Sequence, residues 1–78
     1  MIYVYAIKSK SRNYIYVGLA NDLKRRITEH NNGNNLKTRA YRPFELIYSE
    51  ICSDRIEARK REKYLKSGVG KEFLKKIL

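Results

Sequence analysis

The chain has 78 residues, of which 18 are Lys or Arg and eight are Asp or Glu, so its formal net charge at pH 7 is +10. This length accommodates one small domain and excludes a second module joined by a linker. The charge favours a polyanion as partner, and nucleic acid first of all. Hydrophobic residues make up 42% of the chain and seven are tyrosines, which excludes a disordered chain and indicates a folded globule.

The single cysteine and the single histidine exclude two further classes of protein. Cys52 has no second cysteine with which to form an intramolecular disulfide, and Cys52 with His30 is no ligand set for a structural zinc ion. No apolar run approaches the roughly 20 residues that span a bilayer, and the N-terminal residues lack the layout of a signal peptide. We therefore expect a reduced, cytoplasmic protein that is neither secreted nor embedded in a membrane.

The first predicted elements are two strands that pair. Residues 2–7 are β-branched or aromatic at almost every position, which indicates a strand with both faces partly covered. Residues 9–13 carry turn-forming side chains, and residues 14–18 are a second β-rich run. The two runs are therefore predicted to form an antiparallel hairpin.

A helix is predicted after the hairpin. Asn21 or Asp22 can cap it, and Leu23, Ile27 and His30 fall on one face of it. The asparagine-glycine run that follows ends this helix, because asparagine side chains compete for backbone hydrogen bonds and glycine tolerates a positive φ.

The second half of the chain predicts a strand and two helices. Residues 44–51 alternate in part and contain β-formers, which suggests a third strand. Ser53 or Asp54 opens a helix that ends near residues 67–68, with Glu57 in the acidic position of a capping box. The elements follow the α+β order ββαβαα. The short terminal helix is predicted to pack back on the sheet through its apolar residues, Phe73, Leu74 and Ile77.

Glu62 has an unusual place on the predicted second helix. It shares a stripe with Ala58 and Leu65, which puts its carboxylate on or beside the packed face. Mg²⁺ is often held by one or two carboxylates while water and substrate phosphate fill the remaining positions. Glu62 alone therefore suffices in principle as a ligand for metal-assisted phosphodiester hydrolysis. The alternative is a partly buried glutamate that pairs with an arginine.

Arg26 and His30 are four residues apart, so their side chains are neighbours on a helix and can act on one small volume. The planar guanidinium can make two hydrogen bonds to a phosphate, and histidine is the side chain that titrates near neutrality. The alternatives are a solvated charge for Arg26 and, for His30, a helix-end residue that is satisfied by a backbone carbonyl.

Tyr5 and Tyr16 lie on the paired strands, where a tyrosine is ordinarily half-buried with its hydroxyl at the edge. A phenol with a pKa of about 10 is almost fully protonated at neutral pH. To act as a base, either tyrosine would need a nearby cation or a proton-accepting neighbour. Arg26, His30 and a metal ion would supply these.

These positions coincide with the motifs of a known family. Residues 3–5 (Tyr-Val-Tyr) stand where GIY-YIG nucleases have Gly-Ile-Tyr, and residues 16–18 (Tyr-Val-Gly) stand where they have Tyr-Ile-Gly. Arg26 follows Tyr16 by ten residues and His30 follows four later, as in the family's helix. Residues 56–66 resemble the helix of the metal-binding glutamate. Over nearly its whole length, the chain resembles the small single-domain form of the GIY-YIG nuclease superfamily, related to the catalytic domain of the excision-repair nuclease C subunit.

The resemblance implies one domain over residues 1–78, with a three-stranded antiparallel sheet flanked by helices. It also implies a one-metal hydrolysis of DNA strands. In this scheme Glu62 would hold Mg²⁺ or Mn²⁺, and Arg26 would stabilise charge on the phosphate. Tyr5 or Tyr16 would orient or deprotonate the attacking water, and His30 would assist the proton transfer. Which tyrosine is the base stays open.

Other residues would serve structure and DNA binding. Gly18 would let the backbone approach its neighbours closely at the end of the second strand, although an ordinary strand-ending glycine also explains it. Basic side chains could form a phosphate-contacting surface that makes binding salt-sensitive, although basic helix faces are often merely solvated. These side chains are Lys24, Arg25, Arg39, Arg42, Arg59, Lys60, Arg61, Lys63 and Lys66.

Three classes of function follow, in decreasing order of support. The first is a metal-dependent DNA endonuclease of low sequence specificity, or a catalytic unit whose specificity comes from DNA structure or from a partner protein. The second is a nucleic-acid-binding module of the same fold with weak or absent catalysis. The third, a membrane-surface protein, has the least support, because the basic helix carries no Trp or Phe on its apolar side.

Overall fold

The computed structural model describes all 78 residues, and it has the predicted order ββαβαα. Three antiparallel strands form one sheet of order β2-β1-β3, which confirms the expected fold. None of the helices combines the length and the apolarity needed to cross a bilayer. The elements are β1 (Ile2–Ser9), β2 (Ile15–Ala20), α1 (Leu23–Asn31), the 3₁₀ helix η1 (Arg39–Tyr41), β3 (Phe44–Cys52), α2 (Arg55–Lys66) and α3 (Gly68–Lys76).

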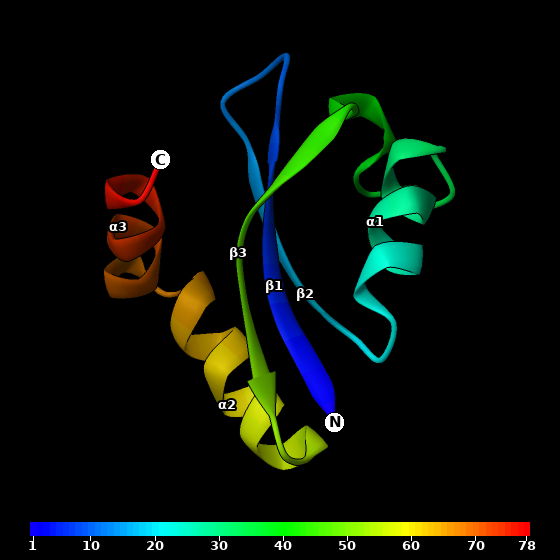
Figure 1. Ribbon diagram of the computed structural model, residues 1–78. Helices are drawn as coiled ribbons and strands as arrows, with labels where there is room; N and C mark the ends of the chain where they lie inside the picture. The colour runs from blue at the N-terminus through cyan, green and yellow to red at the C-terminus, as the bar shows by residue number, and fades with distance from the viewer.

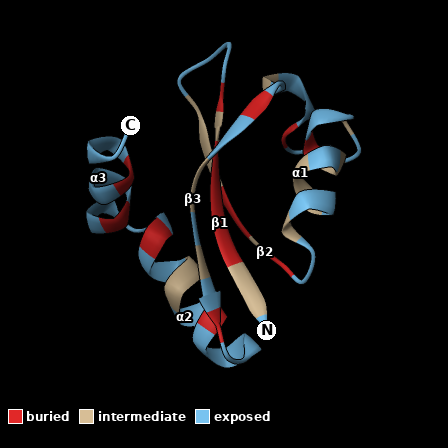
Figure 2. Ribbon diagram, viewed as in Figure 1, coloured by how far each residue is buried: buried red, intermediate tan, exposed pale blue.

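The central strand β1 is covered on both of its faces. Helix α1 lies on one side of the sheet, and α2 and α3 lie on the other (Figure 1). Val4 and Ala6 belong to the apolar cluster on the side of α2 and α3, whereas Tyr5 and Ile7 belong to the cluster on the side of α1. The strand is therefore buried along most of its length (Figure 2). Burial on both faces explains its nearly continuous apolar sequence.

Strand register brings the two sequence motifs together. Tyr5 pairs with Gly18 across β1 and β2, and Ile7 pairs with Tyr16. Directly opposed residues share a face of the sheet, so both tyrosines and Gly18 lie on the face that α1 covers. The pairing of β1 with β3 contains a shift between Ala6 and Ile7, which is a local irregularity that the sequence pattern did not indicate.

The helix starts follow the predicted capping chemistry. The Asp22 carboxylate accepts a hydrogen bond from the backbone N–H of Arg25, and the Asp54 carboxylate accepts one from the backbone N–H of Glu57. Each carboxylate thereby satisfies a helix N–H that has no partner within its own helix. Past the end of α1, Gly33 has a φ of 81°, as expected for the residue that breaks the helix.

Helix α3 differs in part from its prediction. Leu74 is fully buried, but Phe73 is 36% exposed and Ile77 is 43% exposed. The prediction that all three pack back on the sheet is therefore wrong for Ile77 and only partly right for Phe73, whose ring meets Tyr48 edge-on at 5.3 Å. The reason is that α3 packs mainly on α2, through the buried Gly70, so only a narrow stripe of the helix reaches the core.

The contact between α2 and α3 generates a stability prediction. A methyl group on Gly70 would lie 2.5 Å from Leu65 Cα and would also clash with the Tyr64 carbonyl oxygen. We expect Gly70→Ala to lower the free energy of unfolding by about 1–3 kcal/mol, because the backbone of α2 must shift. The matched control is Gly68→Ala, where the added methyl has open space, and it should be neutral or slightly stabilising. Urea unfolding of both variants tests this, and equal midpoints would contradict it.

Candidate active site

A buried chain of hydrogen bonds lies at the centre of the site. The Tyr5 hydroxyl on β1 is 2.9 Å from His30 Nε2, and His30 Nδ1 is 2.8 Å from Thr38 Oγ1. All three residues are at most 1% exposed. The chain thus joins the central strand, the last turn of α1 and the loop before η1.

Burial sets the protonation state of this chain. It raises the pKa of Tyr5 above its ordinary range, and the nearby Tyr16 phenol adds to this, against the opposing charge of Arg26. Burial also lowers the pKa of His30, with a further contribution from Arg26. At neutral pH, a neutral phenol therefore faces a neutral imidazole. When the imidazole carries its hydrogen on Nδ1, it donates to Thr38 and accepts from Tyr5.

Tyr16 connects the buried chain to an open cleft. Its ring centroid lies 5.0 Å from that of His30 and 6.4 Å from that of Tyr5. Tyr16 and His30 line a cleft of about 470 Å³, together with Arg26, Glu29 and the loop after α1. The Arg26 guanidinium is 43% exposed at this cleft and 3.7 Å from the Glu29 carboxylate. The cleft therefore offers an anion a guanidinium next to two aromatic groups.

Gly18 leaves the space that the tyrosine rings occupy. A Cβ atom at this position would lie 2.6 Å from the Tyr5 hydroxyl oxygen and 2.9 Å from Tyr16 Cε2. Any larger side chain would displace the phenol that contacts His30. The close approach expected at Gly18 is thus an approach of side chains to its backbone.

Glu62 lies on α2, on the other side of β2, where its side chain is 15% exposed. Its carboxylate is 3.5 Å from Arg59 and 3.1 Å from Lys66, so ion pairs of the kind proposed as the alternative are present. The charge of Glu62 still reaches the buried chain, because it contributes to the raised pKa of Tyr5. This contribution is smaller than those of burial, Tyr16, Arg26 and Glu29.

The Glu62 carboxylate can bind a hard divalent cation, but the protein does not surround such an ion with ligands. No group of three or more His, Cys, Asp or Glu side chains is close enough to hold a metal ion. A single carboxylate fits an ion such as Mg²⁺, which keeps several waters and completes its shell with substrate phosphate. It does not fit a structural zinc ion, which takes four protein ligands.

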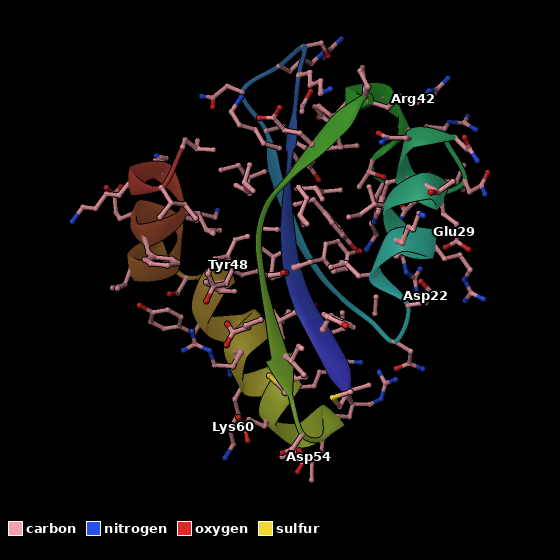
Figure 3. All side chains as sticks on the ribbon, in the orientation of Figure 1. Asp22, Glu29, Arg42, Tyr48, Asp54 and Lys60 are labelled. Atoms are coloured by element: carbon pink, nitrogen blue, oxygen red, sulfur yellow. The ribbon has the colours of Figure 1, made fainter.

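The residues expected to contact phosphates are exposed, but they lie on two sides of the sheet. Figure 3 shows Arg42 beside η1, and Lys60 on the middle of α2 pointing away from the sheet. Arg61 is engaged within the fold, because its Nε lies 3.1 Å from the Glu50 carboxylate. On the side of α1 and η1 lie Lys24, Arg25, Arg39 and Arg42, and on α2 lie Arg59, Lys63 and Lys66.

Thr38 is the site residue that the sequence did not reveal. It lies in an irregular loop without apolar periodicity, and nothing in its neighbours indicates that it is buried. The two ends of this loop are tied together, because Asn31 at the end of α1 accepts a 2.6 Å hydrogen bond through its side chain from the N–H of Phe44 at the start of β3. Together with the hydrogen bonds from the Ser9 hydroxyl to the Tyr41 carbonyl and from the Lys10 N–H to the Pro43 carbonyl, this contact between distant segments places Thr38 beside His30.

His30 gives a prediction on stability and pH, since it is the single histidine of the chain. Its pKa in the folded protein lies below the ordinary value of 6.5. Between the two values the unfolded chain binds a proton that the folded protein does not, so the contribution of His30 to stability is complete above the ordinary pKa of 6.5 and is lost as the pH falls below it toward the lowered pKa of the folded protein. We expect the urea midpoint of the wild type to fall over this window. In His30→Gln the loss should be much smaller, and an equal loss would contradict the assignment.

Comparison with known proteins agrees with the motifs. The GIY-YIG catalytic domain matches residues 1–76. A UPF0213 protein of Staphylococcus saprophyticus is 40% identical over 76 residues, which cover 96% of this chain and 92% of that protein. A UPF0213 protein of Clostridium perfringens is 43% identical over 67 residues, which cover 85% of this chain and 71% of that protein.

The fold agrees with a solved relative as well. The solution NMR structure of the UPF0213 protein BH0048 from Bacillus halodurans superposes with a TM-score of 0.57 at 32% identity. The match covers 99% of this chain and 85% of that one. Motifs, sheet topology and relatives agree, and the chain therefore belongs to the GIY-YIG catalytic domain family, a family of nucleases.

Proposed function

We propose that this protein is an endonuclease that uses Mg²⁺ or Mn²⁺ to hydrolyse DNA phosphodiester bonds with low intrinsic sequence specificity. The observation that carries the proposal is the buried Tyr5–His30–Thr38 chain, which ends beside a cleft that also presents Arg26. A phenol in contact with a buried proton acceptor, next to a cation for a phosphate, is the arrangement that hydrolysis by water needs. The functional unit is residues 1–78 as one domain.

Tyr5 and His30 would move the proton in this scheme. The Tyr5 hydroxyl is shut off from bulk water, so it would act as a base only on the attacking water bound in the cleft, taking a proton from that water as it passes its own proton to His30 Nε2. The water oxygen then bonds to phosphorus, the bond to the leaving oxygen breaks, and that oxygen takes a proton from solvent. Tyr16, which borders the cleft, would orient the attacking water.

Arg26 and Glu62 would act on the charge of the phosphate. The exposed guanidinium can exchange its 3.7 Å contact with Glu29 for two hydrogen bonds to phosphate oxygens. Glu62 would hold the divalent cation, which when bound supplies further stabilisation of the negative charge that develops on the phosphate. Arg59 and Lys66 hold the Glu62 side chain in place through their ion pairs.

Low sequence specificity follows from the chemistry of the cleft. Guanidinium, ammonium and phenol groups contact the sugar-phosphate backbone, and such contacts position a nucleic acid without reading its bases. Preference for a particular target would then come from the structure of the DNA or from a partner protein. RNA offers the same phosphates.

A second candidate function is a nucleic-acid-binding module with weak or absent catalysis. The observation in its favour is the pairing of Glu62 with two cations, against which a metal ion must compete. The two functions differ at this residue. An enzyme needs the Glu62 carboxylate, whereas a binding module does not.

Nicking of supercoiled plasmid tests the proposal. We expect cleavage by the wild type with Mg²⁺ or Mn²⁺ and none with EDTA. Glu62→Gln should abolish cleavage because the amide cannot hold the cation, and Arg26→Ala should lower the rate by about 10²- to 10³-fold. The matched control is Glu45→Gln, at an exposed position of β3. Cleavage that survives Glu62→Gln in a variant with wild-type circular dichroism would contradict the enzymatic proposal.

Thr38 should act as a positioning residue for His30. Thr38→Val removes the partner of Nδ1 at nearly constant size, so we expect a fall in the cleavage rate of about 10- to 100-fold and a displaced pH profile, because the imidazole loses its fixed tautomer. Thr38→Ser keeps the hydroxyl and should stay close to wild type. Tyr5→Phe should reduce the rate at least as far as Thr38→Val. A wild-type rate and pH profile in Thr38→Val would contradict this role.

A further inference from the structure

A second depression in the surface borders the proposed reaction site but lies largely outside it. It has a volume of about 550 Å³ and lies along β2, between this strand and helices α2 and α3. Its apolar floor is formed by the half-buried Ile15 and Tyr16, and the fully buried Leu65 and Leu74 lie beneath it. Lysines surround this floor, and we call the depression the lysine groove after them: Lys66, Lys71 and Lys75.

The lysine groove and the cleft of the candidate active site are separate depressions that share one lining residue. Tyr16 lines both the lysine groove and the cleft of Arg26 and His30. At the same end, Lys66 lies 3.1 Å from the Glu62 carboxylate. From there the groove extends along β2 as far as Asn13 and Tyr14 in the hairpin. A polymer whose phosphate lies in the cleft would therefore pass Tyr16 to enter the groove.

The chemistry of the groove selects among the possible polymers. An apolar floor with a rim of ammonium groups fits a ligand that has flat apolar groups on one side and negative charges on the other. A single nucleic-acid strand presents unpaired bases and phosphates in this way. A duplex does not, because its bases are stacked inside and its outer surface is phosphate and sugar.

We propose that the lysine groove binds an unpaired strand of nucleic acid that continues from the scissile phosphate. The inference rests on the proposed function in one respect, namely that the scissile phosphate lies in the cleft next to Tyr16. Lys71 and Lys75 of α3 would contact the phosphates, and the bases would cover the apolar floor. The substrate of the enzyme would then be DNA that has a single-stranded segment next to the cleavage position.

Binding measured without cleavage tests this proposal. The probe is a fluorescein-labelled single-stranded 12-mer of thymidine in EDTA, and the readout is anisotropy as a function of salt. Each lost phosphate contact reduces the slope of log K against log[salt] by about 0.7, which corresponds to a loss of about fivefold in affinity at 0.1 M salt. We therefore expect Lys75→Gln to lose about fivefold and Lys71→Gln/Lys75→Gln about 25-fold. The matched control is Lys76→Gln, on the same helix but outside the groove, and it should stay within about twofold.

Two further probes separate a strand from other polyanions. A 12-mer of abasic deoxyribose-phosphate should bind the wild type at least about fivefold more weakly than the thymidine strand, because it has no bases to cover the floor. A blunt 12-base-pair duplex should be bound with little dependence on Lys71 and Lys75. The proposal would be overturned if Lys75→Gln and Lys76→Gln lost the same affinity, or if the abasic strand bound as tightly as the thymidine strand. It would also be overturned if duplex binding depended on Lys71 and Lys75 as strongly as strand binding does, or if poly-glutamate competed fully with the strand.

The same experiment distinguishes failure of this inference from failure of the proposed function. Because the assay contains EDTA, groove binding is measured whether or not the protein cuts DNA. Strand binding that depends on Lys71 and Lys75 in a protein that never nicks plasmid would leave the lysine groove in place and remove the catalytic proposal. If the protein nicks plasmid but Lys71→Gln/Lys75→Gln loses no strand binding, the catalytic proposal would stand and the lysine groove would be removed.

Discussion

Burial of the Tyr5 hydroxyl is the constraint on which the rest of the site depends. β1 is the central strand and has helices on both sides, so Tyr5 cannot turn its hydroxyl to bulk water. A buried hydroxyl without a hydrogen-bond partner costs free energy, and the His30 imidazole supplies that partner. The imidazole is buried in turn and needs Thr38. The need of each buried polar group for a hydrogen-bond partner thereby produces a connected polar chain from the sheet to a distant loop.

Acidic residues are scarce in this chain, and several of the few carboxylates pair with neighbouring cations. With a net charge of +10, a glutamate near the surface meets cations from its own helix or from its neighbours. Glu29 holds Arg26 beside the cleft, Glu50 keeps Arg61 within the fold, and Glu62 is held by Arg59 and Lys66. Exposed ion pairs of this kind contribute little stability. Their effect is to orient guanidinium groups and to leave an excess of positive charge for a polyanion.

The parts of the site that could be predicted are those that local rules control. Helical spacing placed Arg26 beside His30, strand pairing placed Tyr5 beside Tyr16, and aspartates began α1 and α2 as capping chemistry requires. Thr38 could not be found in this way, because its burial depends on how the loop closes between α1 and β3. The groove beside Lys71 and Lys75 depends on how α3 packs on α2 through Gly70, which neighbouring sequence does not determine, and Ile77 is exposed because it lies past the end of α3.

The position of β2 at the edge of the sheet explains why two depressions meet there. The helices lie on opposite sides of the sheet, α1 on one and α2 and α3 on the other (Figure 1). Because β2 has a neighbour only on the side of β1, its outer edge is open to both helical layers, and Tyr16 borders the cleft on one side and the lysine groove on the other. A strand that crosses this edge meets a guanidinium, a phenol and then ammonium groups in order. If the lysine groove binds a strand as we propose, a duplex would have to separate its strands to follow the same path, and the open edge of the sheet would favour DNA with an unpaired segment.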